Sequence, residues 1–395
     1  MKQKYPPLLM NSELVKNLES IRSAGVQGEE ARKMLGVLLQ SALKLEFATV
    51  PPYLSAAFSL SNDNQEIKDL IVRISKEEML HMTVVANLMN AIGIAPDIVK
   101  AVPNYPYDLD VLDPPLRLDL SSFSFELVEN LFMQIETPEE PVTFLTRGVP
   151  SEDVTKPETI GQFYERVIEL INEDTIPDLF KNAERDIYKQ IQVSPNFKRV
   201  AYSGNTDEQE YHLEEALNFI ITDKKSAVRH LNWIIGQGEG ATPFDPLTAE
   251  GIPGHYYRFE SILKSKYLIK DDAVPDLGYS YSGGDLPFST AGVNEFETNA
   301  KAENYTAHPG VERSMLRFNK EYSKMVDYLQ LAFNCPGPEQ KEEAGAAYKA
   351  SLQIMRKMDG RAGKIIRAAA RVEGGDVKAG IPFQYTPTPE QPADQ

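Results

Sequence analysis

The chain has 395 residues, of which 42% are hydrophobic and 25% are charged, the balance of a globular protein that buries a substantial core. Its 41 basic and 58 acidic residues give a formal net charge of −17, which argues against nucleic acids and anionic lipid surfaces as partners. The chain has one cysteine, Cys335, and no apolar stretch of signal-peptide or membrane-spanning length, so we expect no internal disulfide, no membrane partner and a cytoplasmic location.

Helical spacing of apolar residues is the dominant pattern from the first third of the chain onward. It predicts a helical segment over residues 11–60, as two helices. Pro51 and Pro52 are expected to kink or break it near its end, because proline lacks the amide that a helix needs. A second long helix is expected over residues 64–92. Residues 95–122 are rich in proline, tyrosine and aspartate and are expected to form an ordered crossover rather than a helix.

The rest of the chain is also expected to be helical, and strand signals are scarce. The further helices predicted, in chain order, are residues 123–135, 158–172, 223–236, 313–333 and 339–371, with a loop-rich insertion at 195–210 and an irregular linker at 271–305. These elements define an all-α fold, a four-helix bundle with a long crossover, an insertion and additional C-terminal helices. We expect residues 1–270 to form the bundle and residues 271–395 to form a linker and a helical extension that packs on it.

Glu78 and His81 are the strongest local signal for a metal site. They form a Glu-x-x-His pair, and residues three apart project from the same face of a helix. That face is apolar, since Ile74 precedes the pair and Val85 follows it. A carboxylate among apolar side chains is costly unless it is paired or bound to a cation. The alternative is a glutamate at the edge of the apolar stripe that forms a salt bridge with a lysine.

A second carboxylate, Glu46, lies on the inward face of the preceding helix, in phase with Leu39, Leu43 and Val50. Two helices that each bury a carboxylate need a common reason, and a shared cation supplies it. Sets of carboxylates and imidazoles suit iron or manganese. In bundles that hold two metal ions, two helices each supply a Glu and the other two each supply a Glu-x-x-His pair. Only His81 among the five histidines has a glutamate three residues before it, so this pattern is half met.

Five separated segments carry a resemblance to a known family. They are LKLEFATVPPYL (residues 43–54), EEMLHM (77–82), FMQIETP (132–138), GQGEG (236–240) and HYYRF (255–259). In this order they resemble the ferritin-like domain of the iminophenylpyruvate dimer synthases, the chromopyrrolate-type synthases of indolocarbazole and violacein pathways. The resemblance covers about residues 30–265 and continues more weakly to Pro382 and Phe383. Those synthases are much longer, and nothing in this chain corresponds to their large additional region.

The resemblance implies a ferritin-like bundle with two metal ions and a ligand set made of Glu46, Glu78, His81, Glu136, Glu239 and His255. The alternatives are an exposed carboxylate in a glycine turn for Glu239 and a surface histidine for His255. Glu136 ends an apolar helix and fits the family motif, so it is preferred to its competitor Glu165, which lies in a charged stretch. His230 is expected at the edge of the core rather than at the metal.

Two metal ions bridged by carboxylates can bind dioxygen or peroxide. We therefore expect an oxidative enzyme that acts with O2 or peroxide on a small molecule, amino-acid-derived or aromatic. The alternative is an iron-handling protein without an organic substrate: a ferroxidase, a peroxide scavenger or an iron store. The long crossover, the insertion and the C-terminal extension are better suited to the walls of a substrate pocket than to the compact subunits of a storage shell.

Iron is the expected metal, and manganese is the second choice. Tyr53, Tyr256 and Tyr257 are candidates for orienting His81 and His255 through their other ring nitrogen or for delivering electrons, with ordinary core packing as the alternative. No nucleic acid and no membrane is expected as a partner, and assembly with further copies of the same chain is left open.

Overall fold

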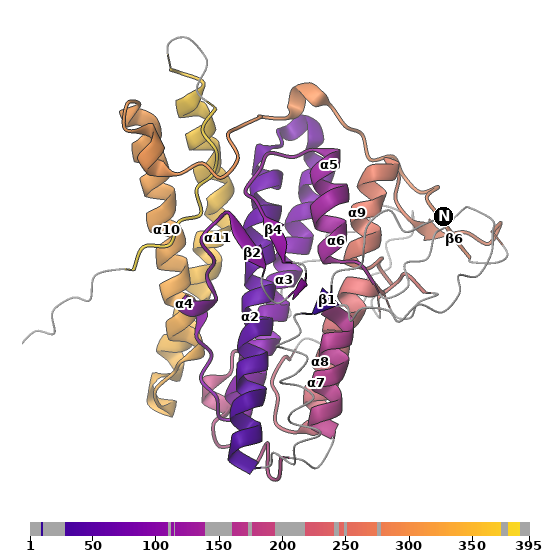
Figure 1. Cartoon of the computed structure of the whole chain (residues 1–395), viewed down its shortest axis with the longest axis vertical. Coiled ribbons are helices and arrows are strands. Elements are labelled where there is room, and N and C mark those ends of the chain that lie inside the picture. The colour runs from indigo at the N-terminus through magenta and orange to yellow at the C-terminus, as the bar shows by residue number, and fades with distance from the viewer. Residues whose placement is uncertain are drawn as a thin grey trace, which may run out of the picture.

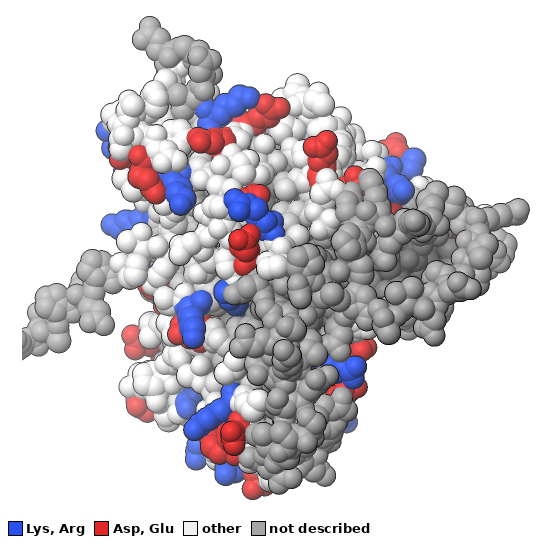
Figure 2. Space-filling view, viewed as in Figure 1, with Lys and Arg blue, Asp and Glu red and all other residues white. Residues whose placement is uncertain are grey.

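The structure is a computed structural model of the chain. It describes residues 9–10, 28–109, 112–113, 115–138, 160–172, 176–193, 218–240, 245–248, 251–274, 278–372 and 378–387. Within these residues helices predominate, which confirms the all-α prediction, and none of the helices is long and apolar enough to cross a membrane (Figure 1). Acidic and basic side chains are interspersed over the described part of the face in Figure 2, without a large patch of one sign.

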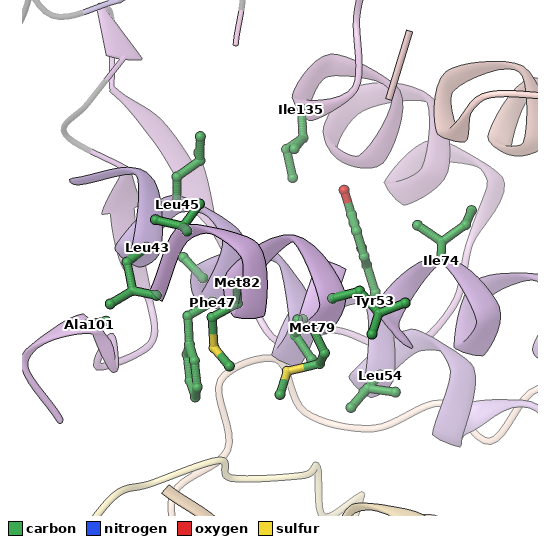
Figure 3. Close-up of a cluster of buried hydrophobic side chains, with 14 of the residues drawn as sticks. Leu43, Leu45, Phe47, Tyr53, Leu54, Ile74, Met79, Met82, Ala101 and Ile135 are labelled. Carbon is green, nitrogen blue, oxygen red and sulfur yellow. The ribbon is translucent and has the colours of Figure 1, made fainter. Parts of the chain in front are cut away.

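Helices α2 (Gly28–Ser59) and α3 (Gln65–Ala91) form the centre of the bundle, joined by the short 3₁₀ helix η1 (Asn62–Asn64) (Figure 1). Apolar residues spaced at helical intervals bury the faces that these helices turn toward each other. Figure 3 shows part of this core, where Phe47 of α2 lies beside Met82 of α3. The predicted helix of residues 64–92 is thereby confirmed, whereas residues 11–27 lie outside the described residues.

Of the kink or break expected at Pro51 and Pro52, the break was wrong, because α2 continues through both residues. The kink stays a prediction. A proline at position 52 removes the amide that would bind the carbonyl of Ala48, four residues earlier. The hydroxyl of Tyr105, in the crossover, donates a hydrogen bond of 2.6 Å to that same carbonyl. A partner from another segment therefore satisfies the backbone group that the proline leaves free.

The other two arms of the bundle are each divided into an upper and a lower helical segment (Figure 1). One arm consists of the continuous turns α5 (Phe125–Leu127), η2 (Val128–Phe132, a π-helical turn) and α6 (Met133–Ile135), and further on α7 (Ile160–Asn172). The other consists of α8 (Lys224–Glu239) and α9 (His255–Lys264). Helix α7 packs against α8, and α9 packs against η2 and α6. Both arms are thus interrupted at the same level of the bundle.

The crossover is mainly irregular, as predicted, but it contains one unexpected helical turn, α4 (Ile98–Ala101). Its chain also forms a short hairpin of β2 (Tyr107–Leu109) and β4 (Leu116–Leu118), which pair antiparallel with Tyr107 opposite Leu118. The remaining short elements are β1 (Leu9–Met10) paired with β3 (Leu112–Asp113), η3 (Ile187–Lys189), and β5 (Ile269–Lys270) paired with β6 (Tyr279–Ser280).

Two long helices at the C-terminal end, α10 (Pro309–Phe333) and α11 (Lys341–Ala369), form a hairpin beside α2 and α4 (Figure 1). The linker before them is irregular, as predicted, with the 3₁₀ turns η4 (Thr290–Gly292) and η5 (Ala302–Tyr305); a third, η6 (Pro338–Gln340), joins the two helices. One cluster of buried side chains runs from Ala31 to Phe383. The division into units of residues 1–270 and 271–395 stays a prediction, and the insertion at 195–210 lies outside the described residues.

Candidate metal centre

Five of the six predicted ligands lie together in the interior of the bundle. They form two groups in which the donor atoms are all within 4.8 Å of one another: Glu46, Glu78 and His81, and then Glu78, Glu136 and His255. Glu78 belongs to both groups. Four of the five side chains are buried, and that of Glu136 is partly buried.

The long helices α2 and α3 place three of these ligands, and the interruptions of the two divided arms place the other two. Glu46 projects from the middle of α2, and Glu78 and His81 project from one face of α3. Glu136 immediately follows the last residue of α6, and His255 is the first residue of α9. The bundle therefore supplies three ligands from the sides of long helices and two from helix ends.

Both imidazoles direct Nδ1 toward the carboxylates. Nδ1 of His81 lies 3.3 Å from Oε2 of Glu46 and 3.7 Å from Oε1 of Glu78. Nδ1 of His255 lies 2.8 Å from the same Oε1 of Glu78 and 3.3 Å from Oε2 of Glu136. The two rings are stacked, with their centroids 5.4 Å apart. One carboxylate oxygen of Glu78 thus lies near Nδ1 of both histidines.

The buried charge of this group has few compensating partners. Oε1 of Glu78 and Nδ1 of His255 are both buried without a well-directed hydrogen bond in the described structure. Burial, followed by the negative charge of Glu136, raises the pKa of Glu78 to about 7. A cation placed between these donors would offset both costs, because it neutralises the carboxylates and uses the free lone pairs. The residues present therefore fit a pair of metal ions of the kind that accept oxygen and nitrogen ligands.

Glu239, the sixth predicted ligand, belongs to neither group in the described structure. It is the last residue of α8 and lines a cavity of about 40 Å³ together with Glu46, Glu78, His81 and Glu136. Its carboxylate occupies the space in front of Gly161, where a Cβ atom would lie 2.2 Å from Oε1 of Glu239. A side chain at position 161 would therefore displace the Glu239 carboxylate from where it lies. The role of Glu239 as a metal ligand stays a prediction.

The structure separates the alternatives that the sequence left open for the positions of Glu136, His255 and His230. Glu165 lies on α7 and is exposed, whereas Glu136 lies at the centre. His255 is fully buried and is not a surface histidine. His230 belongs to neither ligand group, as predicted, although it is buried more deeply than a position at the core edge implies. Its ring packs edge-on against Phe219 at 5.7 Å.

We expect His230 to make the fold sensitive to acid. Burial, together with the charge of Arg229, lowers the pKa of His230 from 6.5 to about 4. The unfolded chain binds more protons between these values, so the free energy of unfolding should fall as the pH drops through them. This one group contributes at most about 1.4 kcal/mol per pH unit. A His230→Leu variant should lose that part of the pH dependence when urea denaturation is compared at about pH 7 and about pH 5. An identical pH dependence in both proteins would contradict the expectation.

Two tyrosines hold the two carboxylates that each belong to only one ligand group, those of Glu46 and Glu136. Tyr53 donates a 2.7 Å hydrogen bond to Oε1 of Glu136, and Tyr164 donates a short one to Oε1 of Glu46. The sequence marked Tyr53 as a candidate for orienting the histidines, whereas its hydroxyl contacts a carboxylate. Tyr164 was not a candidate, and no local pattern marks it. Tyr257, with Tyr256 packed against it, belongs to a separate small cluster near β6, where core packing is the simpler account.

Glu77 is a further side chain at the site that sequence reasoning passed over. Its Oε2 lies 3.0 Å from Nε2 of His255 and 2.5 Å from Nη2 of Arg258. The charge of Arg258 and the hydrogen bond with His255 outweigh burial, so that the pKa of Glu77 falls to about 2. The sequence signal available was the pair of adjacent acidic residues on α3, of which only Glu78 is in phase with the apolar stripe.

The fold and this centre define a ferritin-like helical bundle with an internal carboxylate–histidine site. The family model described as Ferritin-like matches residues 39–264, a range that includes all six predicted ligands. The chain belongs to this family.

Comparison with individual proteins agrees with this assignment and confirms the resemblance to the chromopyrrolate-type synthases. Dichlorochromopyrrolate synthase of Lentzea aerocolonigenes is 23% identical over 359 residues, which cover 80% of this chain and 32% of the synthase. The chain thus spans about a third of the length of that relative. The crystal structure of a ferritin-like protein from Caulobacter vibrioides superposes with a TM-score of 0.51 and 20% identity, over 89% of this chain and 97% of the other. That likeness supports the fold alone.

Proposed function

We propose that the chain is a ferritin-like oxidative enzyme that holds two metal ions, most simply iron, and acts with dioxygen or peroxide on a small aromatic molecule derived from an amino acid. The observation that carries the proposal is the pair of ligand groups that share Glu78. We assign Glu46, Glu78 and His81 to one ion and Glu78, Glu136 and His255 to the other, with Glu239 as the additional carboxylate at the cavity. The similarity to dichlorochromopyrrolate synthase supports the substrate class.

Two redox-active ions held there would supply the electrons that reduce dioxygen or peroxide. The protein itself contributes placement and exclusion of water. Glu78 spaces the two positions, while the hydroxyls of Tyr53 and Tyr164 keep the carboxylates that they contact turned inward. Ile135 and Ile234 form apolar walls of the cavity, which limits the approach of water.

The size of the cavity bears on what can enter it. About 40 Å³ accommodates water, a metal ion or a diatomic oxidant, whereas a benzene ring needs a cavity of about 150 Å³. An aromatic substrate would therefore bind beside the cavity rather than between the ligands. The same observation favours the second candidate, an iron-handling protein such as a ferroxidase or peroxide scavenger, which needs no room for an organic molecule.

Metal analysis combined with oxygen uptake separates these functions. Protein purified from iron-supplemented cells is expected to contain about two irons per chain by mass spectrometry of the elements. Oxygen consumption should then rise when imines of aromatic 2-oxo acids are added to the iron-loaded protein. Uptake that follows added ferrous iron and ignores the imines would favour the iron-handling function. Protein that binds neither iron nor manganese would overturn both.

A further inference from the structure

The two histidines of the centre are held very differently at the ring nitrogen that faces away from it. Nε2 of His255 meets the carboxylate of Glu77 at 3.0 Å, and Glu77 in turn meets Arg258 at 2.5 Å. Nε2 of His81 is buried and has no hydrogen-bond partner in the part of the chain that the structure describes. The edge of the Trp233 ring system packs against His81, with the centroids 5.3 Å apart.

This difference determines which ring nitrogen carries the proton in His255, whereas no described contact at Nε2 determines it in His81. A carboxylate accepts hydrogen bonds, so Glu77 selects the form of His255 that carries its proton on Nε2. The lone pair of Nδ1 is then available to a cation held together with Glu78 and Glu136. Among the described residues, Nε2 of His81 has no such carboxylate partner. A carboxylate on the outer nitrogen also makes an imidazole a stronger metal ligand, and loss of such a partner typically costs 10- to 100-fold in metal affinity.

Arg258 explains why Glu77 serves as an outer partner rather than as a ligand. Glu77 lies on α3, and Arg258 lies on α9. His255 and Arg258 are one helical turn apart on α9, so the single carboxylate of Glu77 can contact both. Arg258 is 1% exposed and its charge balances that of Glu77. The carboxylate is therefore anchored outside the ligand groups, on the far side of the imidazole ring.

We propose that Glu77, held by Arg258, is a positioning residue that makes the His255 position the tighter of two metal positions, so that ions bind there first and at the His81 position second. The His255 position consists of Glu78, Glu136 and His255, and the His81 position of Glu46, Glu78 and His81. This inference rests on the proposed metal-binding function and adds an order of loading to it.

The test is a titration of the metal-free full chain with Mn²⁺ in the absence of oxygen, in which the electron paramagnetic resonance signal of free Mn²⁺ counts the unbound ion. The wild-type protein should show two binding events that differ by about tenfold or more in dissociation constant. His255→Ala should remove the tight event, whereas His81→Ala should remove the weak one. Glu77→Gln should weaken the tight event about 10- to 100-fold and leave the weak event within about threefold of its wild-type value.

Two further variants guard this test against indirect effects. Glu66→Gln, on the exposed first turn of α3, is the matched control and should titrate as the wild type does. Glu77→Gln leaves Arg258 buried without its counter-charge, so the double variant Glu77→Gln with Arg258→Gln removes both charges together. Circular dichroism establishes that each variant is folded.

The outcomes distinguish the order of loading from the existence of the site. Two equal binding events in the wild type, or a tight event that survives both in His255→Ala and in a folded Glu77 variant, would overturn the order of loading while leaving the metal centre in place. A wild-type chain that binds no Mn²⁺ and no iron would overturn the proposed function, and this inference with it.

Discussion

Replacement of Glu78 by alanine is expected to abolish the binding of both metal ions. Glu78 is the one residue common to the two ligand groups, and its Oε1 lies near both histidines. Its removal takes a carboxylate from each position and the bridge between them, whereas Glu46→Ala and Glu136→Ala each take a ligand from one position. Elemental analysis after reconstitution with iron should therefore find close to no iron in the Glu78 variant and about one ion in each of the other two.

The matched control for this series is Glu165→Ala, because Glu165 is an exposed glutamate on α7 that competed with Glu136 as a candidate ligand. It should retain both ions. The Glu78 variant is expected to stay folded, since burial raises the pKa of this carboxyl to about 7 and an ionised Glu78 does not stabilise the metal-free bundle. A folded Glu78→Ala protein that still held two ions would refute the assignment of a shared ligand.

Asn87→Ala is expected to lower the free energy of unfolding by about 3 kcal/mol or more, because it leaves several buried backbone groups without partners. Nδ2 of Asn87 donates to the carbonyls of Ile191 at 2.9 Å and Phe219 at 2.8 Å. Oδ1 accepts from the amide of Ile191 at 2.9 Å. This one fully buried side chain on α3 thus fastens two irregular segments to the bundle.

Urea denaturation monitored by circular dichroism measures this effect. The matched control is Asn62→Ala on the exposed turn between α2 and α3, which should change the free energy of unfolding by no more than about 0.5 kcal/mol. A loss below about 1 kcal/mol for Asn87→Ala would mean that neighbouring groups or water replace its three hydrogen bonds.

The helices and part of the centre could be predicted because helical spacing records which side chains share a face. Glu78 and His81 are three apart on an apolar face, and Glu46 is in phase with the leucines before it, so all three were found from spacing. The continuity of α2 through Pro52 could not be predicted in this way. It depends on a hydrogen bond from Tyr105, and no local pattern shows that a distant hydroxyl will replace a missing amide.

The remaining parts of the centre depend on contacts between segments far apart in the sequence. Glu136 and His255 came from the family resemblance, since both lie at helix ends where spacing carries no information. Tyr164 and Glu77 were missed because their partners are on other helices, and an acidic residue beside Arg258 in space is not beside it in the chain. Glu239 lines the cavity but belongs to neither ligand group among the described residues, so its role as a ligand stays a prediction.

The interruption of two arms at one level has a consequence for how the molecule assembles. Two of the donor residues sit where the chain leaves one helix or enters another, and such ends fray more readily than the middle of a long helix. An ion that bound Glu136 and His255 together with Glu78 would act as a non-covalent cross-link between these ends and α3. The metal-free core would then leave these two helix ends less tightly held than α2 and α3, and the bound ion would hold them in place.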